Sequence, residues 1–333
     1  MKDFILIFTS IFYEALPFIV VGAIIAGVLE EMLPQNLIAR ILPKSKLLGI
    51  GMGALLGLTF PMCECGIIPV MRRLLRKGLP LSCCVAYLLA GPIINPVVLF
   101  STYVAFSGME NATEGGRLSY QMGGIMMVIC RLSMAFLVSV VTSLVVDRLY
   151  QKHGNTLLTP LALPPKEDAT GENSKGKNNS GFSRLSRISE TALHDFIDIS
   201  VYLTLGALLA AFSRIWFSHE TIAELSRANI AAAILLMMGF AVLLCLCSEA
   251  DAFVAASFVT LRPAAKLGFL VIGPMVDLKL YMMYTQVFRP KLIWTIFLTV
   301  ALQVFLYTMI VHYLWENLAP RYVTPPAVTV KSN

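Results

Sequence analysis

Charged residues are scarce in this chain. Asp, Glu, Lys and Arg make up only 14% of its 333 residues, about half their share in a typical globular protein, whereas hydrophobic residues make up 57%. Apolar runs of about 20 residues recur along the chain, and a run of that length spans a bilayer as an α-helix. The lack of charge argues against two ordinary soluble domains, and we expect an all-α polytopic membrane protein.

The sequence also lacks the short motifs of common catalytic classes. It contains no Walker A sequence, no Gly-x-Ser-x-Gly and no His-Glu-x-x-His, so ATP use within this chain and hydrolase chemistry have no support. Its four histidines show no metal-ligand spacing. The Lys and Arg residues behind the net charge of +6 cluster in loops, which is typical of the positive-inside bias and not of nucleic-acid binding. We expect no enzymatic activity, no bound cofactor and no nucleic-acid partner.

Cysteine is present, but not in a pattern that suits disulfides. The seven cysteines are an odd number, and none lies in a polar loop. Adjacent Cys83 and Cys84 are typical small residues of an apolar helix. Four of the others form two Cys-x-Cys segments, Cys63-Glu64-Cys65 and Cys245-Leu246-Cys247.

The two Cys-x-Cys segments begin a pattern that the chain repeats. Each is followed by a Gly-Pro turn, Gly91-Pro92-Ile93-Ile94-Asn95 in the first copy and Gly273-Pro274-Met275-Val276-Asp277 in the second. The separation is 28 residues in both copies, from Cys63 to Gly91 and from Cys245 to Gly273. A single proline kink would be structural, whereas matched breaks in two repeats indicate a substrate site near the bilayer midplane. We interpret the copies as the halves of a transport site, with broken helices at the repeat interface.

The repeated pattern divides the chain. We expect a membrane repeat over residues 1–147, a flexible cytoplasmic linker over 148–191, a second membrane repeat over 192–318 and a polar tail over 319–333. The linker has the composition of a disordered segment and is rich in Lys and Arg. The first apolar run lacks a small-residue cleavage motif, so we interpret it as a retained span and not as a signal peptide.

Two topologies fit this division. Four full spans in each half would give parallel repeats, whereas three spans and a re-entrant Cys-x-Cys hairpin in each half would give inverted repeats. The distribution of Lys and Arg is the same for both. Residues 229–261, however, would form about 50 Å of continuous helix, which exceeds the hydrocarbon core of about 30 Å. A break at the second Cys-x-Cys is therefore expected, which favours the inverted arrangement with about four membrane segments in each half.

Thiolates of the Cys-x-Cys segments suit soft ions such as trivalent arsenic, copper(I) or zinc. Ionisable groups in a membrane are costly, so nearby carboxylates indicate function, either by adding charge or by accepting protons. The residues predicted to bind substrate are Cys63, Glu64, Cys65, Gly91, Pro92, Asn95, Cys245, Cys247, Glu249, Asp251, Gly273, Pro274, Asp277 and Lys279, and the four thiols are the candidate metal ligands. Asp277 and Lys279 are expected to form an ion pair with each other or across the repeats. In the competing interpretation, the small residues only permit a tight turn.

Other charged residues lie in or beside the apolar runs. Glu14 in the first run and Asp198 at a comparable place in the second half are candidates for carrying coupling protons, and they suit an interface equally well. Arg72, Arg73 and the basic residues that follow them are predicted to be a positive-inside anchor.

Four segments resemble the predicted-permease family of ArsP and YraQ, and those of the second half are most similar to its YcgR-like branch. They are residues 61–69, 89–96, 247–255 and 273–277. The resemblance extends over roughly residues 5–315 apart from the linker, and it implies a multi-pass permease. Resemblance to the wider family implies efflux of trivalent organoarsenicals, with the paired cysteines as ligands. The YcgR-like branch implies a second permease subunit and an unsettled substrate, with metal handling suggested. Glu64 stands where the commoner form of the motif has serine, and its charge favours a cationic substrate.

These observations lead to three hypotheses. The first is a secondary permease that crosses the cytoplasmic membrane several times and moves a small solute through the lipid bilayer, either a soft metal ion or a metalloid. The second is a membrane subunit that does not transport but anchors or regulates a partner permease subunit. The third is a membrane thiol redox protein, because Cys-x-Cys can cycle to a disulfide, although the sequence offers no histidine pair for a quinone or haem.

Overall fold

The structure is a computed structural model, and it describes residues 2–32, 45–107, 117–160, 181–216, 230–258 and 261–318. Within these segments there is no β-strand, only an isolated bridge between Leu158 and Phe288. The elements are α1 (Lys2–Met32), α3 (Lys46–Thr59), α4 (Glu64–Arg76), α5 (Leu81–Ala90), α6 (Pro96–Ser107), α7 (Arg117–His153), the 3-10 helix η2 (Gly154–Leu157), α8 (Gly181–Trp216), α10 (Ile230–Leu244), α11 (Asp251–Ser257), α12 (Pro263–Ile272), α13 (Leu278–Tyr284) and α14 (Pro290–Leu318). The prediction of an all-α protein is confirmed.

Four helices are long and apolar enough to cross a membrane, namely α1, α7, α8 and α14. Large apolar side chains are exposed on their outer faces, among them Phe212 of α8 and Leu298 and Leu302 of α14. Apolar surface of this extent is stable only against lipid or another protein. The arrangement is therefore that of a polytopic membrane protein, as predicted.

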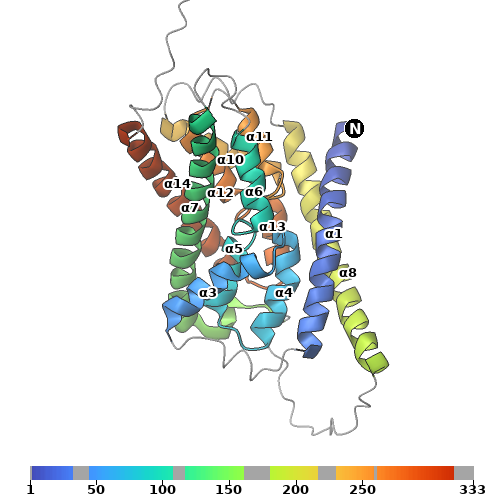
Figure 1. Ribbon diagram of the computed structural model, residues 1–333. Helices are drawn as coiled ribbons and strands as arrows, with labels where there is room; N and C mark the ends of the chain where they lie inside the picture. The colour runs from blue at the N-terminus through green and yellow to red at the C-terminus, as the bar shows by residue number, and fades with distance from the viewer. Residues whose placement is uncertain are drawn as a thin grey trace, which may run out of the picture.

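The long helices of the two halves run in opposite directions (Figure 1). In that view α1 starts at the upper face and descends, whereas α8, which packs along it, starts at the lower face and ascends. Likewise α7 descends and α14 ascends. Side-chain contacts agree with this picture, because Lys291 at the start of α14 lies 3.0 Å from the His153 ring at the end of α7. Opposite directions favour the inverted arrangement, while the superposition of two repeats stays a prediction.

The first Cys-x-Cys segment lies where the chain turns back inside the molecule. The helix before it, α3, starts at the lower face, where Lys46 forms an ion pair with Asp147 of α7 (3.1 Å). The helix after it, α4, returns to the same face and ends beside α8, where Arg73 forms an ion pair with Asp195 (2.8 Å). The segment therefore lies at the tip of a re-entrant hairpin (Figure 1).

The second Cys-x-Cys segment lies at the tip of a hairpin from the opposite face. The long apolar run is broken as predicted, because α10 ends at Leu244, directly before Cys245. The chain then returns through α11 to the upper face (Figure 1). Arg262, directly before α12, lies there beside His312 near the end of α14 (3.4 Å). The two hairpins thus enter the molecule from opposite sides.

Two further spans are broken at the Gly-Pro turns. The breaks are residues 91–95, between α5 and α6, and residues 273–277, between α12 and α13, and both contain turn and bend positions in the same order. In each break the last side chain accepts a hydrogen bond from a backbone amide of the following helix: Asn95 accepts one from Val97 (3.0 Å), and Asp277 accepts one from Leu280 at the start of α13. Such capping satisfies amides that a helix start leaves without partners. The two spans are therefore helices broken inside the protein.

Glycines of α3 allow close packing against the first of these spans. A Cβ atom added to Gly53 would lie 2.5 Å from the carbonyl oxygen of Cys83, and one added to Gly57 would lie 2.6 Å from that of Gly91. These separations are too short for any residue but glycine, whereas Gly51 has no atom within 4 Å. At Gly53 and Gly57 the absence of a side chain therefore lets another backbone approach α3 closely.

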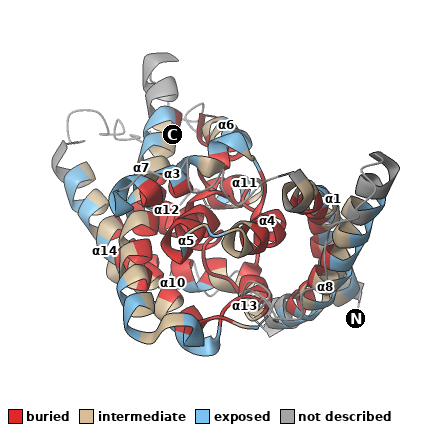
Figure 2. Cartoon of the chain, turned by 90° about the horizontal axis from the view of Figure 1, so that it is seen from below, coloured by how far each residue is buried: buried red, intermediate tan, exposed pale blue. Residues whose placement is uncertain are grey.

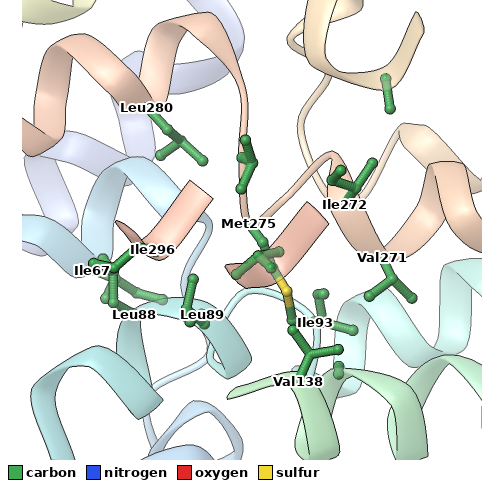
Figure 3. Close-up of a cluster of buried hydrophobic side chains, with 14 of the residues drawn as sticks. Ile67, Leu88, Leu89, Ile93, Val138, Val271, Ile272, Met275, Leu280 and Ile296 are labelled. Carbon is green, nitrogen blue, oxygen red and sulfur yellow. The ribbon is translucent and has the colours of Figure 1, made fainter. Parts of the chain in front are cut away.

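The core lies among the hairpins and the broken helices. Figure 2 shows buried residues concentrated in the inner elements such as α4, α5 and α12, while the outer helices α1, α8 and α14 expose one face. Around the breaks, apolar side chains of both halves pack together (Figure 3), including Ile67 and Ile93 of the first and Met275 and Leu280 of the second. Burial of this shared surface holds the two halves together.

The helices continue into both ends of the segment predicted to be a linker. The first-half helix α7 extends to His153, and α8 already begins at Gly181. Between them, the Thr159 hydroxyl donates a hydrogen bond to the Gln286 carbonyl (2.6 Å), which attaches this connection to the second half. Residues 161–180 and the tail from 319 onward lie outside the described residues, so a flexible cytoplasmic linker and a loose tail stay predictions.

Candidate functional site

The two Cys-x-Cys segments meet inside the molecule. The sulfur atoms of Cys63 and Cys247 and a carboxylate oxygen of Glu64 all lie within 4.8 Å of one another, and the three residues are buried. Cys247 also lies within the same distance of carboxylate oxygens of Glu14 and Glu249, which are themselves within 4.8 Å of each other. We call these five residues the thiol–carboxylate cluster. It draws on α1, on both hairpin tips and therefore on both halves of the chain.

The first hairpin tip is placed by the start of a helix. Cys63 directly precedes α4, and Glu64 and Cys65 lie in its first turn. The partial positive charge at a helix start favours the carboxylate of Glu64 at this position. Close packing brings α1 to the same place, because a Cβ atom on Gly66 would lie only 2.9 Å from the carbonyl oxygen of Phe18. That approach explains how Glu14, one turn earlier in α1, reaches the cluster.

The second hairpin tip is an irregular turn. Residues 245–250 are not helical, and Cys245 has a φ of 48°, the one described non-glycine residue with a positive φ. A side chain is strained in this left-handed region, and such strain is found mainly where function requires it. The Cys245 thiol donates to the Val242 carbonyl oxygen (3.3 Å), so Cys247 is the thiol of this pair that joins the cluster.

Glu64 connects the first hairpin to the second half. Its Oε1 atom accepts a hydrogen bond from Lys279 Nζ (3.0 Å), and its Oε2 atom accepts one from Ser248 Oγ (3.4 Å). The Lys279 and Glu64 side chains are only 2% and 1% exposed. Buried charges are stable only when they are paired and hydrogen-bonded. The Glu64 carboxylate of the first half therefore receives both of these hydrogen bonds from the second half.

Asn95 and Asp277 occupy equivalent positions in the two breaks but have different surroundings. The Asn95 side chain caps α6 through the Val97 amide. Asp277 caps α13, and its second oxygen lies 3.8 Å from Lys279 Nζ, so the predicted pair of Asp277 and Lys279 is present. Only the second break therefore brings charge to the cluster. The predicted residues Gly91, Pro92, Gly273 and Pro274 contribute backbone turns.

Asp251 has a partner away from the cluster. Its Oδ2 atom lies 2.7 Å from Arg131 Nη2, and the Nη1 atom of the same guanidinium lies 2.6 Å from the hydroxyl of Thr102. All three residues are buried, and they come from α11, α7 and α6. The geometry gives Asp251 a direct role in holding the second hairpin against two helices of the first half. The sequence shows Arg131 as a charge within an apolar run, but it does not show the partner of Arg131.

Asp198 does not lie with Glu14 at the cluster. Its carboxylate lies 3.6 Å from Arg72 and 3.4 Å from the His194 ring. Sequence reasoning missed the neighbouring Asp195, which is buried and binds Arg73 through contacts of 2.8 to 3.0 Å. The basic end of α4, predicted only to anchor the chain at the membrane surface, is thus also part of a buried ion-pair network with α8.

The cluster combines two kinds of metal ligand. Thiolate sulfur selects soft ions, and carboxylate oxygen adds negative charge and binds harder ions. Both kinds converge here from three separate elements, which a tight turn alone would not require. The donor set of Cys63, Cys247 and Glu64 fits a thiophilic solute better than it fits an alkali or alkaline-earth ion.

Comparison with known proteins agrees with the family resemblance seen in the sequence. The family model described as predicted permease, ArsP_1, matches residues 1–313. Protein YcgR of Bacillus subtilis strain 168 is 38% identical over 288 residues, which cover 86% of this chain and 89% of that protein. A Streptococcus mutans protein named "Putative two-component membrane permease complex subunit" is 33% identical over 306 residues, 92% of this chain and 93% of its own. Escherichia coli YraQ is 28% identical over 80 residues, about a quarter of each chain. No solved structure matches.

Proposed function

Because the chain belongs to the predicted-permease family, we propose that it is a secondary permease of the cytoplasmic membrane for a small thiophilic solute. The solute is a soft metal ion or a metalloid compound such as a trivalent organoarsenical. The observation that carries this proposal is the meeting of Cys63, Glu64 and Cys247 within 4.8 Å in the buried interior. Soft donors that converge at one place suit the binding of such a solute.

The surrounding helices support a role in transport. The cluster lies at the tips of two hairpins that enter from opposite faces, beside two broken helices (Figure 1). In transporters with paired broken helices, the substrate site lies where the two halves meet, and access alternates between the faces. In this arrangement the lower side is held by Arg73 and Asp195, which tie α4 to α8. We propose that these contacts open and close as the site changes the face to which it is exposed.

Flux measurements with thiol variants test the proposal. The full chain is reconstituted in liposomes, and uptake of Cd²⁺ and of trivalent methylarsenical is followed by metal analysis. Cys63→Ser and Cys247→Ser should reduce flux of the true substrate to background, because serine keeps the small volume but removes the soft ligand. Cys130→Ser is the matched control, since this half-buried thiol lies in α7 outside the cluster. Unchanged flux in both cluster variants would contradict the thiol site.

A second candidate function is that of a subunit that supports a partner permease. The observation that favours it is the name of the Streptococcus mutans relative, which assigns that protein to a two-component permease complex. The two candidates differ in where the chemistry takes place. A supporting subunit should tolerate Cys63→Ser and Cys247→Ser without loss of cellular resistance or uptake, and it should co-purify with a partner after mild detergent extraction. A transporting subunit needs its thiols whether or not a partner is bound.

A further inference from the structure

We propose that Lys279 is a tethered cation that competes with the cargo for Glu64, so that the site selects a positively charged solute. This inference rests on the proposed function and names the class of its substrate. Lys279 Nζ lies 3.0 Å from Glu64 Oε1 and 3.8 Å from Asp277 Oδ2, with both partners fully buried. The ammonium therefore stands between a carboxylate of the first half and a carboxylate of the second.

The charges of these three residues do not balance. Two carboxylates and one ammonium leave one excess negative charge in the protein interior, where an uncompensated charge is costly. When Cd²⁺ binds, Cys63 and Cys247 release two protons and become thiolates, so the charge of the ion replaces that of the protons and the ion takes the place of the Lys279 ammonium at Glu64. A neutral arsenical forms As–S bonds to the two thiols with loss of water and offers Glu64 no positive charge in place of the ammonium. The trio therefore favours a cation over a neutral compound.

Asp277 is a second carboxylate to which the Lys279 ammonium can bind when it leaves Glu64. Asp277 Oδ2 is buried and has no hydrogen-bond partner in the described part of the chain, although Lys279 Nζ is only 3.8 Å away. An unsatisfied buried oxygen is costly, so this atom is a ready acceptor. A short movement of the lysine side chain would leave Glu64 free to bind the solute. It would also give Asp277 Oδ2 a hydrogen-bond donor.

The backbone around Lys279 restricts the movement to the side chain. A Cβ atom on Gly206 of α8 would lie 2.9 Å from Lys279 Cα, so α8 and α13 are in close contact at this residue. Asp277 holds the start of the same helix through its cap on the Leu280 amide. The flexible four-carbon stem can carry Nζ from one carboxylate to the other while the helix stays fixed.

Binding of Cd²⁺ to the purified full-length chain tests the inference, measured by isothermal titration calorimetry with flux in liposomes as the second readout. Lys279→Met removes the competitor, so we expect the Kd for Cd²⁺ to fall about tenfold, within the usual range of coupling between sites. Flux at saturating Cd²⁺ should fall, because nothing then displaces the ion from Glu64. Lys279→Arg keeps the charge and should stay close to the wild type in affinity. A role confined to packing cannot tighten binding.

Controls separate this inference from the proposed function. If Cd²⁺ binding is lost in Cys63→Ser but equal in the wild type and Lys279→Met, the thiol site stands and the competing lysine is refuted. If binding is indifferent to the cysteines, or is absent in the wild type, both ideas fail. Should Lys279→Met not fold, Lys279→Gln keeps a hydrogen-bond donor toward Glu64 without the charge, and it must show the same tightening. Weaker binding in a folded neutral variant overturns the inference.

Discussion

The two halves of the molecule share one sequence pattern of Cys-x-Cys tip and Gly-Pro break, but they place their charges differently. In the first half the charge lies at the hairpin tip, where Glu64 separates the cysteines, and the break ends in neutral Asn95. In the second half the tip has Leu246 between the cysteines and Glu249 after them, and two further charges, Asp277 and Lys279, lie at the break. The hairpin of one half therefore meets the break of the other, with Glu64 bound to Lys279 (3.0 Å). The buried carboxylate of Glu64 therefore takes its charged partner from the other half.

The halves also differ in how their hairpins are packed. Gly57 and Gly239 stand at equivalent positions, each six residues before the first cysteine of its segment. Gly57 presses against the backbone of the first break, whereas Gly239 has no atom within 4 Å of an added Cβ atom. On the outer side, α1 packs against α4 while α8 packs against α13, which are not equivalent elements. Corresponding elements of the two halves therefore have different packing partners.

The largest effect is expected from breaking the charge pair between the halves. Glu64→Leu leaves Lys279 buried with only the more distant Asp277, and removal of one partner of a buried pair costs about 3–5 kcal/mol of stability. We expect a lower thermal unfolding temperature in detergent and no transport. The double variant Glu64→Leu with Lys279→Met should recover much of the stability and still not transport. A double variant as unstable as the single one would contradict the pairing.

A smaller loss should distinguish the packing of the two halves. Gly57→Ala places a methyl group against the Gly91 carbonyl, and overpacking of this kind costs about 1–3 kcal/mol. Gly239→Ala meets open space and should be neutral or stabilising by up to about 1 kcal/mol, since alanine favours the helix. Thermal unfolding of both variants measures the difference. Equal effects at the two positions would show that the hairpins pack alike.

A milder change should show which break carries charge. Asp277→Asn keeps a side chain that caps α13 but removes the alternative partner of Lys279, so the lysine should hold Glu64 more tightly. We expect the Kd for Cd²⁺ to rise about tenfold with the fold intact. The counterpart Asn95→Asp has Val97 where the second half has Lys279, so it adds a carboxylate without that partner and should lower stability. An unchanged Kd in Asp277→Asn would argue against a shared lysine.

The least disruptive test concerns the orientation of the two halves. Single cysteines at Ser174 or Ser180, in a chain otherwise free of cysteine, should react with an impermeant thiol reagent only after cells are opened. A cysteine added ahead of Lys2 should react in intact cells, because α1 begins at the face opposite the start of α8 (Figure 1). If the cysteine ahead of Lys2 and the linker cysteine both react only after cells are opened, the two sites lie on the same side of the membrane. That result would favour the parallel arrangement.

Much of the fold follows from the sequence because membrane helices must be apolar and long. Run lengths predicted the spans, and the excessive length of residues 229–261 predicted the break before Cys245. The matched spacing predicted two broken helices and identified both hairpin tips. These features depend on local composition and on distances along the chain, which a sequence displays directly.

The partners of the buried charges could not be predicted in the same way. Glu64 and Lys279 are 215 positions apart, and Arg131 and Asp251 are 120 apart. The pairing of these charges depends on how the helices of the two halves cross in space, and no pattern along the chain encodes that crossing. For the same reason Asp251 was assigned to the substrate site, while the structure pairs it with α7.

The most direct test of the account is a disulfide between the two hairpin tips. The full-length chain would keep only Cys63 and Cys247 and carry a protease site within residues 161–180. After oxidation with copper phenanthroline and cleavage, we predict that the halves stay joined on a non-reducing gel and separate on reduction. A matched chain that keeps only Cys130 and Cys247 should separate under both conditions. Halves that separate without reductant in the Cys63 and Cys247 chain would contradict a site shared by the two Cys-x-Cys segments.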